Sequence, residues 1–169
     1  MVVRPRPGDQ RQGLLVVANR VLRCALGRGG IRSVKREGDG ATPLGPMRLL
    51  SAFVRRDRPR RLVSSLALDP ILPADVWCDA PGDRNYNRPV RLPYAASHEK
   101  MRREDHLYDV VIVLDANIRP RRRGMGSAIF FHLARPGYTP TEGCVAISAH
   151  DMAWLLPRLS PRTVMTVTR

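Results

Sequence analysis

Short runs of apolar and β-branched residues, bounded by glycine, proline or charged residues, recur along this chain and predict a fold built from strands. The clearest run covers residues 109–114, Asp-Val-Val-Ile-Val-Leu, and is typical of a buried strand. Residues 14–18 and 21–26, with Asn19-Arg20 between them, are expected to form a hairpin. Further strands are expected at residues 31–35, 47–54, 127–133, 145–147 and 163–168.

One segment has a convincing helical pattern. Ser148 is suited to cap a helix, and Asp151 three residues later completes a capping box with Asp in place of the usual Glu. Pro157 is expected to kink or shorten this helix. The apolar residues expected to face the core follow at helical spacing: Met152, Leu155, Leu156 and Leu159. The chain is therefore expected to be mostly β, with one or two short helices.

The 169 residues are expected to fold as a single domain with a sizeable core. Residues 1–12 are rich in proline, arginine and glycine and are expected to be a flexible basic N-terminal tail, so that the domain covers residues 13–169. Residues 55–106 carry many prolines, and a long irregular stretch in a compact domain is usually functional or else poorly ordered. No apolar run is long enough to cross a membrane, and no secretory signal is visible.

The formal net charge of +14 is the strongest compositional signal, and all basic residues except Lys35 and Lys100 are arginine. One interpretation is attraction to a polyanion, such as nucleic acid, a membrane surface or an acidic wall polymer. The other is a bias toward arginine at solvated positions. Two dense arginine clusters, in residues 55–61 and 119–123, are expected in turns between strands. With an aromatic content of only 5%, a stacking platform for nucleic acid is not expected.

The three cysteines, Cys24, Cys78 and Cys144, are too widely spaced to suggest a metal site, and neither a metal nor a cofactor is expected. Cys24 falls on the more apolar face of its strand and is expected in the core. An odd number of cysteines leaves at least one thiol unpaired, and pairing of Cys24 with Cys78 stays open.

One segment places a histidine and a cysteine close together in the sequence. A thiol attacks carbonyls as the thiolate, and the imidazole of His132 can take the proton of Cys144. Gly143 allows a tight turn and can leave amide N–H groups facing a developing oxyanion. The alternative is that Cys144 is a buried structural thiol.

Four elements follow one another in an informative order. They are Cys24-Ala-Leu-Gly27, Gly40-Ala-Thr-Pro-Leu-Gly45, a strand that ends near His132, and Thr141-Glu-Gly-Cys144. In this order they resemble the catalytic domain of L,D-transpeptidases, the YkuD-like family of bacterial cell-wall enzymes, over most of the chain. The resemblance implies an L,D-transpeptidase-type β-sandwich with one or two short helices. It also implies a cysteine-dependent acyltransferase in the periplasm or cell envelope.

The resemblance implies roles for four residues. Cys144 corresponds to the nucleophile, and His132 to a general base whose imidazole is oriented by a backbone carbonyl. Gly143 and the amide of Cys144 lie where the family builds its oxyanion hole. Thr141 matches the Ser or Thr of the family motif.

Three departures from the family pattern imply an atypical branch. Glu142 stands where the family usually has histidine, and Ala146 stands where it usually has arginine or asparagine. The 12-residue separation of His132 and Cys144 is also shorter than usual. The departures leave the nucleophile and base in place and concern the contacts to the substrate.

The implied reaction joins two peptidoglycan stem peptides, one donor and one acceptor, through a cysteine thioester. The cross-link is either 3-3 or the 1-3 type that joins L-Ala to a diamino acid. Carbapenem-type β-lactams, which mimic the acyl donor in the family, are expected to acylate Cys144. Two alternatives stay open: an L,D-carboxypeptidase that trims stem peptides, and a basic polyanion-binding protein on the same fold.

Seven residues are expected to contact the substrate: Thr141, Glu142, Arg135, Tyr86, Arg88, Arg91 and His98. The arginines are candidates because stem peptides carry carboxylates. Tyr86 is a candidate for lining the groove, and His98 beside Glu99 for a tuned polar pair. The alternatives are a solvated arginine, a tyrosine packed in the core and a polar pair on the surface.

Overall fold

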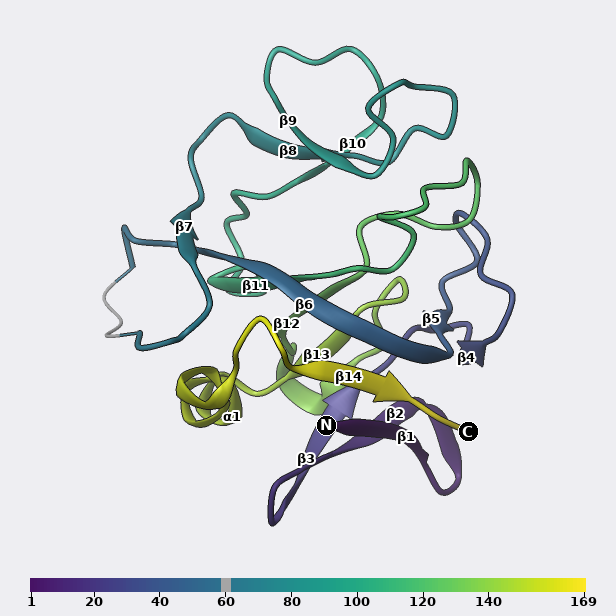
Figure 1. Ribbon diagram of the computed structural model, residues 1–169, viewed down its shortest axis with the longest axis vertical. Helices are drawn as coiled ribbons and strands as arrows, with labels where there is room; N and C mark the ends of the chain where they lie inside the picture. Colours follow the sequence, from purple (N-terminus) through teal and green to yellow (C-terminus); the bar gives the residue numbers. More distant parts are fainter. Residues whose placement is uncertain (59–61) are drawn as a thin grey trace.

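The computed structural model describes residues 1–58 and 62–169. In this part of the chain, strands are accompanied by one short α-helix, α1 (Ala149–Leu155), and by two 3₁₀ turns, η1 (Pro136–Tyr138) and η2 (Leu156–Arg158). The strands are β1 (Val2–Arg6), β2 (Asp9–Val17), β3 (Arg20–Ala25), β4 (Ile31–Arg32), β5 (Thr42–Pro43), β6 (Gly45–Val54), β7 (Leu68–Pro70), β8 (Asp75–Cys78), β9 (Arg88–Arg91), β10 (His98–Lys100), β11 (Val110–Leu114), β12 (Phe130–Leu133), β13 (Val145–Ile147) and β14 (Val164–Val167). The expected mostly-β fold is confirmed (Figure 1).

The main sheet closes on itself. Its strands follow the order β11-β12-β13-β3-β2-β1-β14-β6, with β7 added beside β6. The 10-residue strand β6 makes the closure, because residues 45–48 pair with β14 and residues 49–54 pair with β11. Closure pairs the strand edges that an open sheet would leave exposed.

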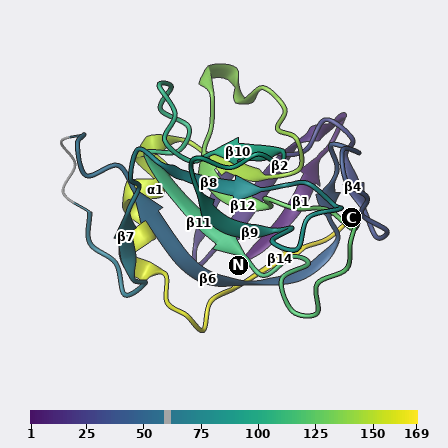
Figure 2. The same cartoon turned by 90° about the horizontal axis from the view of Figure 1, so that it is seen from above.

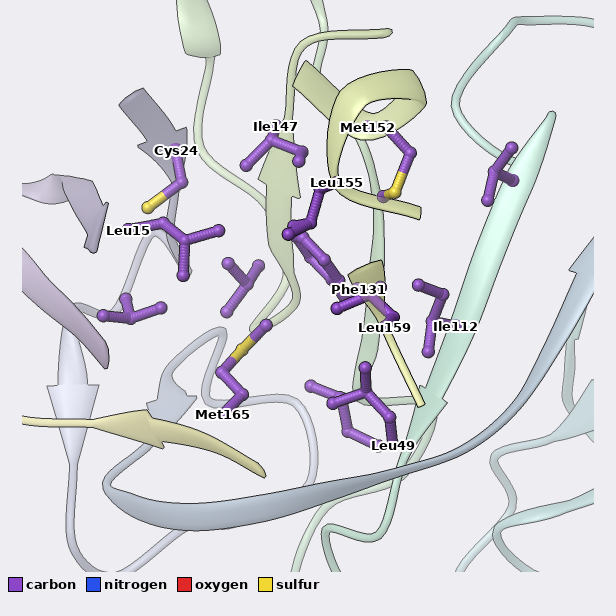
Figure 3. Packing of buried hydrophobic residues seen from close by; sticks show 14 of the residues in the cluster. Leu15, Cys24, Leu49, Ile112, Phe131, Ile147, Met152, Leu155, Leu159 and Met165 are labelled. Atoms are coloured by element: carbon purple, nitrogen blue, oxygen red, sulfur yellow. The ribbon is translucent and has the colours of Figure 1, made fainter. Parts of the chain in front are cut away.

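The apolar faces of these strands and of α1 enclose one core. Figure 3 shows Leu15 from β2, Cys24 from β3, Leu49 from β6, Ile112 from β11 and Met152 from α1 pointing into this common interior. Each of the five is at most 1% exposed. The expectation of Cys24 as a core residue is confirmed, and the structure has it as a thiol rather than in a disulfide.

The expectation of a flexible tail at residues 1–12 is wrong. Residues 2–6 form β1, which lies between β2 and β14 in the sheet and pairs with β14 in parallel, Val3 opposite Val167. The terminal amino group of Met1 donates a hydrogen bond of 2.9 Å to the carbonyl oxygen of Val164. Proline and arginine in this segment hid the strand, which pairs with the neighbouring β2 as well as with β14 at the far end of the chain.

The expected helix start is confirmed. Ser148 Oγ accepts a hydrogen bond of 3.0 Å from the amide of Asp151, as the capping box requires. The helix α1 ends at Leu155, and Pro157 lies in the turn η2 that follows, so the expected shortening is also confirmed. Among the described residues, no helix has the length and apolar character needed to cross a membrane.

A second, three-stranded sheet occupies part of the stretch expected to be irregular. Its order is β10-β8-β9, and we call residues 75–100 the cap. The cap stands at the top of Figure 1, and from above its strands lie over β11 and β12 (Figure 2). Trp77 of the cap packs edge-on against Phe130 of β12, with ring centroids 5.1 Å apart. The cap is therefore seated on the main sheet by an aromatic contact.

The two arginine clusters lie in connecting segments where the structure describes them. Residues 119–123 lie in the connection between β11 and β12, as expected. In the other cluster, Arg55 pairs with Asp57, and Arg58 pairs with the buried Asp109. Residues 59–61 of that cluster lie outside the described residues.

The placement of β1 predicts a contrast between neighbouring valines. Val3→Ala is expected to lower the free energy of unfolding by about 2 kcal/mol, because it removes methyl groups from a buried site. Val2 is 40% exposed, and Val2→Ala is expected to change the stability by less than about 0.5 kcal/mol. Urea unfolding of the two variants measures the difference. Equal and negligible effects would contradict the pairing of β1 with β2 and β14.

Candidate active site

The site is built on the parallel pair β12 and β13. Their register places His132 directly opposite Ala146, so the two side chains share one face of the sheet. Cys144 comes two residues before Ala146, immediately ahead of β13, and all three residues line the same cavity. Strand pairing therefore brings together a histidine and a cysteine that are separated by a loop.

The cavity has a volume of about 400 Å³ and lies between the main sheet and the cap. The main sheet contributes His132, Cys144 and Ala146 to its wall, while the cap contributes Asp79 and Glu99. Because Ala146 is small, no long side chain from this position fills the cavity beside His132.

The geometry of His132 leaves one ring nitrogen available as a base. Its Nδ1 donates to the carbonyl oxygen of Leu133 at 2.9 Å, so in the neutral ring the unprotonated nitrogen is Nε2. The ring of Tyr108 packs edge-on against the imidazole, with ring centroids 5.2 Å apart. Burial lowers the pKa of His132 to about 4. The imidazole is therefore neutral near pH 7 and held by a backbone carbonyl, as the family resemblance implies.

Cys144 is held by backbone groups of the segment that leads into β12. Its Sγ donates to the carbonyl oxygen of Ala128 and accepts from the amide of Phe130, each at 3.2 Å. Among the described residues, no hydrogen bond joins this thiol to the imidazole of His132. Burial raises the pKa of Cys144 to about 12. The resting pair is thus a neutral thiol and a neutral imidazole, so proton transfer must accompany attack on a substrate.

Gly143 is required by close backbone packing. Its φ of 129° is unfavourable for other residues, and a Cβ here would approach the carbonyl oxygen of Ala41 to 2.7 Å. The residue that precedes the Thr-Pro-Leu-Gly element therefore packs directly against the Gly-Cys element. The Thr42 Oγ1 also accepts a hydrogen bond of 2.8 Å from the amide of Gly27, which connects the Cys24-Ala-Leu-Gly27 element to the same region.

Thr141 fixes the turn that carries Cys144. Its Oγ1 donates to the carbonyl oxygen of Cys144 at 2.6 Å and accepts from the amide of Gly143 at 3.2 Å. The second bond is at the long end of the usual range. The Gly143 amide is therefore engaged in the resting site, and an oxyanion would have to displace a weak bond to use it.

The structure brings some of the expected substrate contacts to the cavity and leaves others outside. Arg135, Thr141 and Glu142 line the cavity wall. The others do not line it: Tyr86, Arg88, Arg91 and His98.

Each of these four residues has a structural reason to lie elsewhere. Tyr86 is buried, and its hydroxyl donates to Glu37. Arg88 and Arg91 lie on β9, the strand of the cap at the opposite edge from β10, with their side chains exposed. His98 and Glu99 are neighbours on β10, so their side chains point to opposite faces, and it is Glu99 that faces the cavity. The Nδ1 of His98 hydrogen-bonds the carbonyl oxygen of Ala96.

Several residues of the cavity wall were not expected from the sequence, namely Glu37, Asp79, Arg103, Tyr108 and Ser127. The residues around Trp77 carried a usable signal for one of them. If residues 75–79 are extended and Trp77 faces the core, Asp79 must face the same way. The others depend on loop paths that local sequence does not specify.

The neutral state of the resting pair predicts how Cys144 reacts with iodoacetamide. The alkylation rate should rise about tenfold for each pH unit from about pH 7 to pH 9, because the thiolate fraction grows in that proportion below the pKa. Mass spectrometry of the labelled cysteine, with Cys144→Ser as the blank, measures the rate. A plateau through the neutral range would instead indicate a preformed thiolate–imidazolium pair.

One protein-family model, YkuD, the L,D-transpeptidase catalytic domain, matches residues 8–167. Searches of curated proteins and of solved structures gave no match. The family match runs from the connection before β2 to the end of β14 and includes both His132 and Cys144. The chain belongs to the YkuD family of L,D-transpeptidase catalytic domains.

Proposed function

We propose that this protein is a peptidoglycan L,D-transpeptidase that joins stem peptides through a thioester on Cys144. The observation that carries the proposal is the shared cavity of Cys144 and His132, with the unprotonated Nε2 fixed by the bond from Nδ1 to Leu133. Peptidoglycan lies outside the cytoplasmic membrane, so the site of action is the cell envelope.

In the first step, His132 Nε2 takes the thiol proton as Cys144 Sγ attacks the carbonyl carbon of the donor peptide. The tetrahedral intermediate collapses, the C–N bond breaks, and the leaving amine takes the proton from His132. The product is a thioester on Cys144. The amide of Cys144 is our candidate oxyanion donor, joined by that of Gly143 once it leaves Thr141 Oγ1.

In the second step, the amine of an acceptor stem peptide attacks the thioester carbonyl. His132 accepts a proton from the attacking nitrogen and returns it to the departing sulfur. The result is a new amide bond and a regenerated thiol. Water in place of the amine gives hydrolysis, which is the carboxypeptidase outcome at the same site.

The direct test uses purified disaccharide-peptides of different stem lengths with wild-type protein and Cys144→Ala. Mass spectrometry should find cross-linked dimers with wild type only, and fragmentation should show which residue donates the carbonyl. Shortened monomers without dimers would indicate a carboxypeptidase. If neither product forms, the proposal is wrong and binding of polyanions by the arginine-rich surface becomes the better explanation.

His132→Gln should slow acylation of Cys144 by a carbapenem at least about 100-fold, because it removes the general base. Stopped-flow absorbance of β-lactam opening and intact mass of the adduct measure this. His150, an exposed histidine on α1, provides the control variant His150→Gln, which should acylate at the wild-type rate. Equal rates for the two variants would show that His132 is not the base.

A further inference from the structure

The cavity wall is acidic, although the chain as a whole carries a net charge of +14. Four carboxylates line the cavity: Glu37, Asp79, Glu99 and Glu142. Among the described residues, two arginines line it, Arg103 and Arg135. With His132 neutral, the lining has an excess of negative charge in a protein where negative residues are the minority.

Ion pairs neutralise one part of this wall. Arg28 Nε contacts Glu142 at 2.8 Å, and Arg103 Nη1 contacts Glu99 at 3.1 Å. Both wall arginines also face Asp105, whose Oδ2 lies 2.8 Å from Nη2 of Arg103 and 4.0 Å from Nη2 of Arg135. Arg135, the one expected carboxylate clamp that lines the cavity, therefore already faces a carboxylate of the protein.

Glu37 and Asp79 remain without a cationic partner among the described residues. Glu37 Oε2 accepts from the hydroxyls of Tyr86 and Ser127, the latter at 2.8 Å, and these neutral donors hold it in place without cancelling its charge. The two carboxylates reach the cavity from different parts of the fold, Glu37 from the connection between β4 and β5 and Asp79 from the cap.

The carboxylate of Asp79 is incompletely hydrogen-bonded within the protein. Asp79 extends the strand pairing beyond β8, because its amide donates a hydrogen bond of 3.2 Å to the carbonyl oxygen of Ser97. It lies two residues after Trp77 and so on the same side of the strand, the side that packs on the main sheet. Its Oδ1 is shielded from solvent, yet among the described residues no donor lies within hydrogen-bonding distance of this atom. A shielded carboxylate oxygen without a donor is costly, which is why such atoms are rare in folded proteins.

We propose that Glu37 and Asp79 form an ammonium-binding subsite that receives the acceptor amine. The inference rests on the proposed transpeptidase function, because an amine acceptor is needed only there. An aliphatic amine is mostly protonated near neutral pH, with a pKa of about 10. Two unneutralised carboxylates therefore concentrate it in the cavity beside the thioester on Cys144, and they have no such effect on water.

The proton balance of the step is as follows. The bound ammonium loses one proton to solvent, and the resulting neutral amine attacks the thioester carbonyl. The C–N bond forms, the C–S bond breaks, and a second proton passes from the nitrogen through His132 to the sulfur. Glu37 and Asp79 bind and orient the amine and take no part in bond making, so they are positioning residues.

The experiment first acylates Cys144 with a donor stem peptide and then offers two nucleophiles. One is a stem peptide that carries a diamino acid, whose side-chain amine is an ammonium. The other is hydroxylamine, which is uncharged at neutral pH. Asp79→Asn and Glu37→Gln should each raise the KM for the diamino acceptor about tenfold, leaving the acylation rate and the reaction with hydroxylamine unchanged. Asp69→Asn, an equal change of charge on the exposed strand β7 away from this cavity, should leave all three unchanged.

An unchanged KM for the diamino acceptor in both variants would overturn the subsite. A parallel loss with hydroxylamine would also overturn it, since that would show a general disturbance of the thioester site. Wild-type protein that is never acylated by any donor peptide would refute the proposed function itself, a result distinct from either of these. Because two variants change two separate parts of the fold, misfolding of one leaves the other to decide.

Discussion

The parallel pairing of β12 with β13 is the constraint on which the site depends. Its register sets His132 opposite Ala146 and thereby fixes which face of β13 carries Cys144. A shift by one residue would turn Cys144 to the other face of the strand, away from His132. The tight contact of Gly143 with Ala41 holds the entry to β13 and so opposes such a shift. The geometry of the Cys144 and His132 pair is a consequence of sheet register.

The same packing that positions the two residues also keeps them uncharged. Cys144 and His132 are 7% and 5% exposed, and burial opposes both the thiolate and the imidazolium. A resting thiol bonded to Ala128 is a poor nucleophile toward small electrophiles in solution. In the proposed reaction its activation depends on a substrate that fills the cavity and aligns a carbonyl between sulfur and imidazole. Under that proposal, low intrinsic reactivity and selectivity for a bound peptide have one physical origin.

Features that depend on local interactions were predicted correctly from local sequence patterns. The structure confirms the strand in the apolar run at residues 109–114, the capped helix after Ser148 and the burial of Cys24. The strand β1 and the cap were not predicted, because proline and charged residues interrupt their apolar pattern and because part of their support is distant, from β14 for β1 and from Phe130 for Trp77 of the cap. Cys144 and His132 stand out in the sequence as a candidate nucleophile and base because of their residue types and spacing, whereas the approach of Glu37 and Asp79 to the same cavity depends on the tertiary fold. The alternation of β10, which turns Glu99 rather than His98 toward the cavity, is not apparent from the sequence.

The carboxylates of the cavity wall oppose formation of the thiolate of Cys144. Their presence therefore needs a reason other than activation of this thiol. Glu99 and Glu142 both add to the rise in the pKa of Cys144. In an arginine-rich chain, neutral or basic residues at such positions would favour the thiolate, so the carboxylates are not there to activate the sulfur. An acceptor ammonium is a ligand whose charge matches this wall, which binds it before it loses a proton and attacks. The charge pattern therefore suits the second half of the proposed reaction, in which an amine must arrive, better than the first.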